Sequence, residues 1–244
     1  MPTVDLNCDL GEGFDDAPLF RLVTSASVAC GGHAGDAATM AEACRRAAAN
    51  GVTIGAHPSY EDREGFGRRN QEVEPERLRF QVVAQVAALR VAADAAGVPV
   101  RYLKPHGALY NRIAGDPVQA GAVARAAQDA GLPLLGPPGS AIERAAEERA
   151  VPFFREAFAD RGYTPDGRLA PRGAPGALLT DPAEIAARAL GMVLAGAVTA
   201  TDGTEVRLAF DSLCLHGDTP GAAEAARAVR ARLESGGVTV RPFR

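Results

Sequence analysis

The chain of 244 residues has no apolar run near the roughly 18 residues that a membrane-spanning helix needs. Its first residues lack the basic and apolar regions of a signal peptide. A formal net charge of −4 also gives no general attraction to nucleic acid or to acidic membranes. We therefore expect a cytoplasmic protein that binds neither nucleic acid nor membrane.

Several sequence motifs are absent as well. The four cysteines are widely spaced without a CxxC pair, which argues against a disulfide framework or a zinc knuckle. There is no GxxxxGK[ST] phosphate loop, no HExxH helix and no GxSxG elbow. A nucleotide would have to bind at glycine-rich turns before helices, or on another subunit.

Lysine is nearly absent from the chain. Of the 26 lysine and arginine residues, only Lys104 is a lysine. A general preference for arginine does not explain why one lysine remains. Lys104 ends an apolar run two residues before His106, so we interpret it as a site residue. Chance retention at a surface position is the alternative.

Short apolar runs alternate with longer amphipathic segments along the whole chain, which indicates a parallel sheet within one domain over residues 1–244. Helices are expected at 36–50 and 75–96, and after the Asp-Pro or Thr-Pro pairs that begin at Asp116, Asp181 and Thr219. Segment 162–180 is rich in Gly, Pro and Arg and is interpreted as a functional loop. The expected strands are 3–7, 25–30, 53–56, 101–104, 133–135, 151–154 and 205–210.

Clusters of reactive side chains follow nearly every expected strand. An open sheet concentrates its site at one switch point, whereas a closed barrel brings all strand ends to one mouth. The distribution therefore predicts a β/α barrel with a polar site at the C-terminal ends of its strands.

The first cluster is acidic. Alternation places Asp5, Asn7 and Asp9 on one face of the first strand, with Glu12 in the turn beyond. Neighbouring acids repel unless a cation, a shared proton or a substrate donor lies among them. A turn that merely uses these side chains as caps is the structural alternative.

All four histidines fall in such clusters: His33, His57, His106 and His216. One histidine near a strand end is more often structural, but four of four favour a site. The turns 31–36 and 136–140 each precede a helix, where free N–H groups can bind an anion. The residues concerned are Gly31, Gly32, Asp36, Gly136, Gly139 and Ser140.

Together these clusters resemble the LamB/YcsF family over almost the whole chain. Two small departures are Gly32, where an aromatic residue is usual, and Glu61 before Asp62, where Asp usually follows Tyr60 directly. The matching blocks are DLNCDLGE (5–12), ACGGHAGD (29–36), GAHPSY (55–60), KPHGALYN (104–111), EAFADR (156–161) and CLHGD (214–218).

The resemblance implies a seven-stranded barrel of the glycoside hydrolase/deacetylase type. It also implies a subunit of an ATP-dependent 5-oxoprolinase, which opens the lactam of 5-oxo-L-proline to L-glutamate with two further subunits. ATP, accompanied by Mg²⁺, would bind here or on a partner. Because a lactam is resonance-stabilised and has little ring strain, phosphorylation of its oxygen would create a better electrophile.

For lactam opening, we expect the following roles of the candidate site residues. Asp9, Glu12 or His57 would activate water, and Lys104 and Arg161 would hold a carboxylate, a phosphate or the oxyanion. His33, His106 and His216 would orient the ring and supply the proton of the leaving nitrogen. The two glycine-rich turns are candidate phosphate cradles. Further candidates for substrate or phosphate binding are Asn7, Glu156 and Asp160.

Two other functions stay open at this point. Asp9 with two of the histidines His33, His57 and His106 would suit a divalent metal in an amide hydrolase such as a sugar N-deacetylase. A non-catalytic lactam-binding subunit is the second alternative, although mere binding does not require so many acids and bases. Whether the chain holds a metal is not decided by the sequence.

Overall fold

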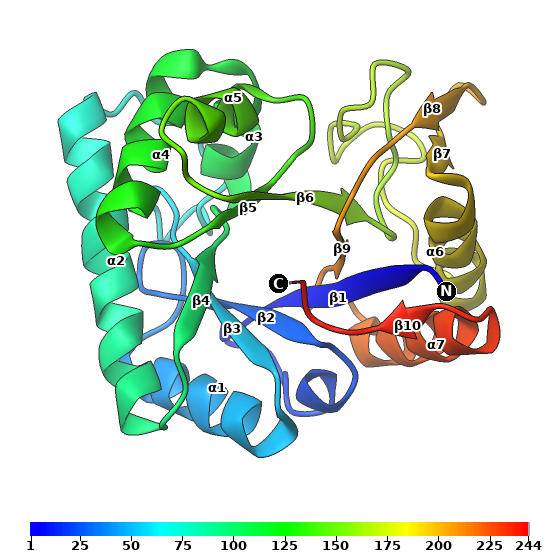
Figure 1. The fold of residues 1–244 in the computed structure, drawn as a ribbon, viewed down its shortest axis with the longest axis horizontal. Helices are drawn as coiled ribbons and strands as arrows, with labels where there is room; N and C mark the ends of the chain where they lie inside the picture. The colour runs from blue at the N-terminus through cyan, green and yellow to red at the C-terminus, as the bar shows by residue number, and fades with distance from the viewer. Residues whose placement is uncertain (244) are drawn as a thin grey trace.

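Seven parallel strands close into a barrel in the computed structural model, which describes residues 1–243 (Figure 1). The order around the barrel is β1-β2-β3-β4-β5-β6-β9, and β9 pairs back with β1. The predicted seven-stranded β/α barrel is therefore confirmed. The barrel strands are β1 (Thr3–Leu10), β2 (Ser25–Ala29), β3 (Thr53–His57), β4 (Val100–Leu103), β5 (Leu134–Gly136), β6 (Phe153–Phe158) and β9 (Ser212–Leu215).

Helices surround the barrel, with α1 packed on α2, α2 on α4, and α6 on α7 (Figure 1). They are α1 (Ala37–Asn50), α2 (Pro75–Ala95), α3 (Gly107–Gly115), α4 (Pro117–Ala130), α5 (Ala141–Glu147), α6 (Pro182–Ala195) and α7 (Ala222–Ser235), with one 3-10 turn, η1 (Leu19–Arg21). Within residues 1–243, none of these helices combines the length and the apolar character needed to cross a membrane.

Most of the helix starts predicted from capping residues are confirmed. The carboxylates of Asp36, Asp116 and Asp181 each accept backbone N–H groups of the helix that follows. The prediction at Thr219 was wrong, because α7 begins two residues later. Its N-cap is Gly221, whose φ of 83° is left-handed, so the Thr-Pro pair lies in the preceding turn.

The expected seventh strand at 205–210 was also wrong. Residues Glu205–Arg207 form β8, which pairs antiparallel with β7 (Ala197–Thr199) outside the barrel (Figure 1). The charged ends of β8 are exposed, whereas all four residues of β9 are buried. The barrel strand is thus the short SLCL run, and a hairpin outside the barrel separates it from α6.

The interior of the barrel is polar because side chains alternate along each strand. In β1 the apolar residues join the hydrophobic core under the helices, while Asp5, Asn7 and Asp9 make hydrogen bonds to neighbouring barrel strands. Asp5 and Asn7 each form a hydrogen bond with Ser212 on β9, and Asp9 accepts one from Lys104, which follows β4. This inward row leads from the base of the barrel to its C-terminal mouth.

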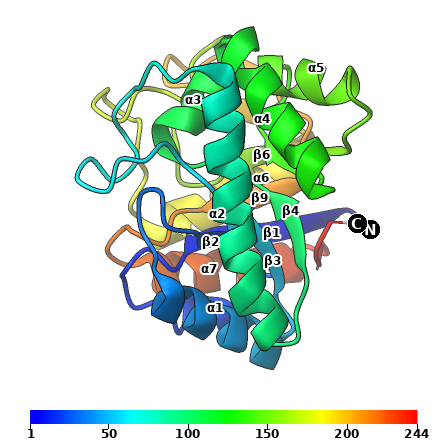
Figure 2. The same ribbon diagram turned by 90° about the vertical axis from the view of Figure 1, so that its left-hand side faces the viewer.

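The opposite end of the barrel is covered by the end of the chain. Strand β10 (Thr239–Val240) pairs with the start of β1, so both chain ends lie on the same side in Figure 2. From there Phe243 packs against Tyr102 at 5.1 Å and Phe154 at 4.4 Å between ring centroids. The polar interior is therefore accessible from the C-terminal strand ends.

Candidate functional site

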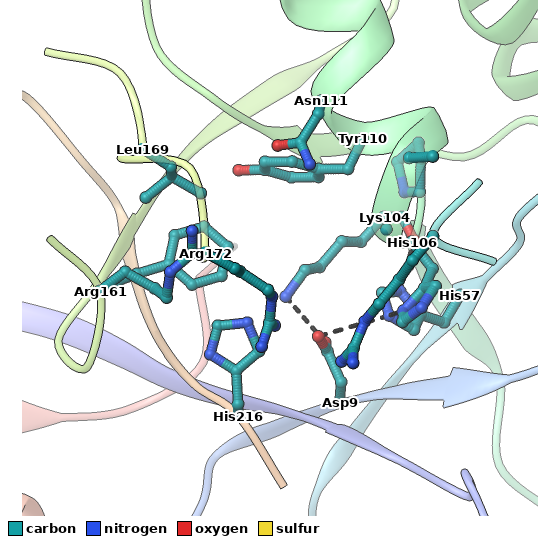
Figure 3. Close-up of a pocket in the computed structure, with 15 residues that line it drawn as sticks. Asp9, His57, Lys104, His106, Tyr110, Asn111, Arg161, Leu169, Arg172 and His216 are labelled. Carbon is teal, nitrogen blue, oxygen red and sulfur yellow. Dashed lines mark hydrogen bonds and ion pairs between the residues drawn. The ribbon is translucent and has the colours of Figure 1, made fainter. Parts of the chain in front are cut away.

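A cavity of about 240 Å³ lies at the C-terminal ends of the barrel strands (Figure 3). Its wall combines acidic, basic and apolar side chains. It brings together six of the residues predicted as catalytic, namely Asp9, His57, Lys104, His106, Arg161 and His216.

Lys104 follows β4 and extends into the barrel, where only 1% of its surface is exposed. Its Nζ lies 2.8 Å from Oδ1 of Asp9 and 2.7 Å from Oε1 of Glu156, and it donates to Oδ1 of Asn7 at 3.1 Å. Burial opposes the charge, but the surrounding anionic groups, Asp9 first, hold the pKa of Lys104 well above its ordinary value. Lys104 is therefore a fixed ammonium ion.

Asp9 is shared between Lys104 and His57, whose Nε2 lies 3.4 Å from Oδ2. Burial raises the pKa of Asp9, but the charges of His57 and Lys104 outweigh it and lower that pKa well below its ordinary value. An acid held this strongly ionised is a weak base. Asp9 is better suited to hold Lys104 and His57 in place than to take a proton from water.

Glu12 lies in a compact group of three histidines behind the cavity wall. Its Oε1 is 2.9 Å from Nε2 of His33 and 3.2 Å from Nδ1 of His106. The rings of His33 and His106 are stacked, with centroids 3.6 Å apart and planes 3° from parallel. Nε2 of His57 completes the group at 3.0 Å from Nδ1 of His106. Burial, partly offset by Glu12, lowers the pKa of His33 to about 4.

His216 and Asp160 form a separate pair on the other side of the cavity. Asp160 accepts from Nδ1 of His216 at 2.9 Å and from its backbone N–H at 3.0 Å. Burial raises the pKa of Asp160, but the charge and hydrogen bonds of His216 more than offset it and lower that pKa. Because an ionised carboxylate only accepts, the proton of the neutral ring lies on Nδ1, and Nε2 then has a free lone pair. Asp160 thus holds the imidazole of His216, which faces the cavity in Figure 3, in one tautomer, as in a catalytic dyad.

Three arginines give the cavity its positive charge. Arg161 is 6% exposed and is fixed by the carbonyl oxygens of Ala170 and Ala177 in the 162–180 loop. Arg68 and Arg172 also line the cavity, and the sequence reasoning did not identify either one. Arg172 belongs to segment 162–180, whose richness in Gly, Pro and Arg predicts a functional loop. That composition is the sequence signal that could have identified Arg172. No comparable signal marked Arg68.

A second cavity of about 630 Å³ adjoins the first and shares Arg161 and Arg172 with it. Glu156, Gly139 and Ser140 lie in its wall. The N–H of Gly139 already donates to Oε2 of Glu143 at 2.6 Å, and Oγ of Ser140 accepts the N–H of Glu143 at 3.3 Å. The polar groups of Gly139 and Ser140 are therefore already hydrogen-bonded within the turn. Gly136, at the start of the turn, is the last residue of β5. Phosphate binding here stays a prediction.

The turn 31–36 lies apart from both of these cavities. A Cβ on Gly32 would come within 2.5 Å of Oγ of Ser59, so its open side is filled by protein. The carboxylate of Asp36 accepts the first N–H groups of α1. An anion at this helix start would have to displace Asp36. Anion binding at Gly31, Gly32 or Asp36 likewise stays a prediction.

The chain matches the model of the LamB/YcsF family over residues 4–244. It is 53% identical over 248 residues to a protein of Streptomyces griseus that is named as a 5-oxoprolinase subunit, covering 98% of this chain and 99% of the relative. It resembles the crystal structure of a lactam utilization protein from Thermus thermophilus with a TM-score of 0.93 and 46% identity, over 99% of this chain and all of the other. A T48 deacetylase, 16% identical over 98% of this chain and 87% of its own, shares the fold alone with a TM-score of 0.51. The chain therefore belongs to the LamB/YcsF family.

Proposed function

We propose that this chain is a subunit of an ATP-dependent 5-oxoprolinase and that its cavity opens the lactam of 5-oxo-L-proline to give L-glutamate. The relative from Streptomyces griseus carries the name of such a subunit, and the match covers nearly all of both chains. The observation that carries the proposal is the pairing, in one cavity, of a fixed ammonium with an oriented histidine.

The substrate is small and carries a carboxylate beside the lactam carbonyl. Arg161 and Arg172 supply guanidinium groups that suit a carboxylate or a phosphate. Phe158 and Leu169 give the same cavity an apolar wall for the ring. Lys104, a localised charge in a buried setting, is placed to stabilise, through its field, negative charge that develops at the reacting carbonyl as the activated lactam is opened.

Proton transfer is assigned to His216. Its Nε2 has the free lone pair needed to accept a proton from water and then to deliver it to the leaving nitrogen. Asp160 is a positioning residue that fixes the tautomer. Asp9, Glu12 and His57 were the bases expected from the sequence, but Asp9 is already bound to Lys104 and Glu12 to His33 and His106.

ATP is assigned to a partner subunit. The two glycine-rich turns of this chain fit its phosphates poorly, because Asp36 binds the first N–H groups of the helix after one turn and Glu143 binds the N–H of Gly139 in the other. ATP with Mg²⁺ would supply the phosphoryl group that makes the lactam reactive. The word "subunit" in the relative's name supports an assembly, and two partners are proposed. The cytoplasmic location stays a prediction that cell fractionation tests.

The deacetylase neighbour, at 16% identity, shows the fold alone. The cluster of Glu12 with three histidines would also suit the metal of a sugar N-deacetylase, but the 53% identity to a named 5-oxoprolinase subunit favours lactam opening. A non-catalytic binding subunit is also disfavoured, because lactam binding alone does not require the oriented pair of His216 and Asp160.

Reconstitution tests the proposal. The purified chain is mixed with the two proposed partner subunits, and glutamate and ADP are followed with 5-oxoproline as substrate. We expect turnover by the mixture, little or none by the chain alone, and loss of turnover when the chain carries His216→Asn. Full turnover by the isolated chain with ATP would contradict the partner assignment, and a mixture that forms no glutamate would contradict the function.

A further inference from the structure

Two imidazole lone pairs face each other behind the cavity wall. Nδ1 of His57 lies 2.7 Å from the carbonyl oxygen of Lys104, and Nε2 of His106 lies 2.9 Å from that of Phe66. Because a carbonyl oxygen only accepts, each of these nitrogens carries the ring's proton when the ring is neutral. The remaining nitrogens, Nε2 of His57 and Nδ1 of His106, then have bare lone pairs only 3.0 Å apart.

A carboxylate lies beside the same two nitrogens. Oε1 of Glu12 is 3.2 Å from Nδ1 of His106 and 3.9 Å from Nε2 of His57. His33 adds Nε2 at 2.9 Å from the same oxygen. The four side chains are all buried, and Nδ1 of His33 has no hydrogen-bond partner among the described residues. Glu12 and the bare nitrogens of His57 and His106 are acceptors grouped so closely that a proton or a metal cation must lie between them.

We propose that Glu12, His33, His57 and His106 bind a divalent transition-metal cation, with Zn²⁺ the best match. One ligand atom from each side chain lies within 4.8 Å of all the others. A tetrahedral ion with bonds of about 2.0–2.1 Å requires its ligand atoms to be roughly 3.3–3.4 Å apart. The separations of 2.9, 3.0, 3.2 and 3.9 Å lie around that value. The stacked rings of His33 and His106 would have to tilt so that both lone pairs point at the ion.

The ligand chemistry selects the ion. Three imidazoles with one carboxylate suit Zn²⁺ and its neighbours in the first transition row, whereas Mg²⁺ and Ca²⁺ prefer sites made of oxygen. The two backbone carbonyls that accept from His57 and His106 are the outer partners that fix the ligand tautomer in metal sites.

This site differs from a triad built on Asp9. The Asp9 carboxylate is bound to Lys104 at 2.8 Å through Oδ1, and of the three histidines its Oδ2 reaches only His57, at 3.4 Å from Nε2. Glu12 instead contacts His33 and His106, at 2.9 and 3.2 Å. His57 and His106 also line the cavity, so the cation would lie in its wall (Figure 3). A role in polarising the lactam carbonyl would rest on the proposed function, but binding of the ion does not.

Metal binding is measured directly on the full chain, freed of any histidine tag and stripped with a chelator. Titration calorimetry with Zn²⁺ should give one site per chain, and Co²⁺ should give the visible absorption of a low-symmetry complex. His57→Asn and His106→Asn should each weaken Zn²⁺ binding by more than the roughly 10–100-fold loss typical of an outer partner.

His216→Asn is the matched control, because His216 lies in the same cavity but is paired with Asp160. It should bind Zn²⁺ like the unaltered chain, and circular dichroism should show that all variants are folded. Absence of a one-to-one site in the unaltered chain would overturn the proposal and leave a shared proton between His57 and His106. Equal weakening by His216→Asn would overturn it as well.

The metal-binding measurement and the reconstitution test of function can fail independently of each other. A chain that binds Zn²⁺ within a reconstituted mixture that forms no glutamate keeps the metal site and loses the 5-oxoprolinase assignment. Turnover by a chain that binds no metal gives the reverse outcome.

Discussion

The ammonium nitrogen of Lys104 lies 2.7 Å from Oε1 of Glu156 on β6, although the strand that positions Lys104 is β4. Asp9 and Asn7 of β1 complete the enclosure with oxygens at 2.8 and 3.1 Å. One charged group thus connects three parts of the barrel. Loss of one partner from such a buried pair costs about 3–5 kcal/mol, because the other charge is left uncompensated.

Lys104→Arg should lower turnover of the reconstituted enzyme at least about tenfold, or about 1.4 kcal/mol of transition-state stabilisation. A guanidinium is a broad planar group and cannot occupy a space enclosed by four neighbours without displacing one. The melting temperature should fall too, which the sequence alone did not suggest. Near-normal kcat in the variant would show that charge alone matters.

The barrel was predictable because its strands and helices carry local signals. Asp116 and Asp181 before proline mark α4 and α6 correctly. The errors lie where burial decides the outcome. Residues 205–207 have a strand-like pattern and do form a strand, but in a hairpin outside the barrel, whereas the barrel uses 212–215. Local pattern does not indicate which of two short strands fills the last place in a closed sheet.

Asp160→Asn should lower kcat by about 10²- to 10⁴-fold, the usual contribution of acid–base catalysis, with a smaller effect on KM. The amide no longer fixes the proton on Nδ1 of His216, so Nε2 loses its constant role as acceptor. Steady-state kinetics of the reconstituted enzyme measure the change.

A double variant checks that the two residues act together. Because they form one unit, Asp160→Asn combined with His216→Asn should be no slower than His216→Asn alone. Additive losses would show that Asp160 serves turnover by another route.

Stability should depend on pH through Asp5, whose pKa burial raises to about 6 despite hydrogen bonds from Ser212, Ser25 and Thr24. The native state then holds this proton more tightly than the unfolded chain does. Its stabilising effect is complete below about pH 4, declines as the pH rises, and is lost above about pH 6. Asp5→Asn removes the ionisation, so it should raise the melting temperature more at pH 7.5 than at pH 4.5.

The comparison is made between variant and unaltered chain at each pH. Asp16, whose pKa burial also raises to about 6, then contributes equally to both and cancels. A variant that loses more stability at pH 7.5 than at pH 4.5 would show that the three hydroxyl groups favour the ionised carboxylate.

The site was partly predictable, because strand ends meet at one mouth in a barrel. That rule explains why Asp9, His57, Lys104 and His216 line one cavity. It does not reveal that Glu12 and His33 lie behind the wall, nor that Arg68 reaches the cavity from the loop after β3. Those placements depend on how loops fold over the mouth, and loops carry no periodic signal.

One such loop passes over the histidines at Gly67, which has a φ of +65°. A Cβ there would come within 2.8 Å of Cβ of His33 and 2.9 Å of Cδ2 of His106. Gly67→Ala should therefore push the stacked rings away from Glu12 and lower turnover at least about tenfold. Gly97→Ala is the matched control, because its φ is +69° and nothing lies within 4 Å of a Cβ there. Both variants carry the same backbone strain of about 1 kcal/mol, so both should lose similar stability from that source. Only Gly67→Ala should also lose turnover, and equal kinetics for the two would show that the loop does not position the histidines.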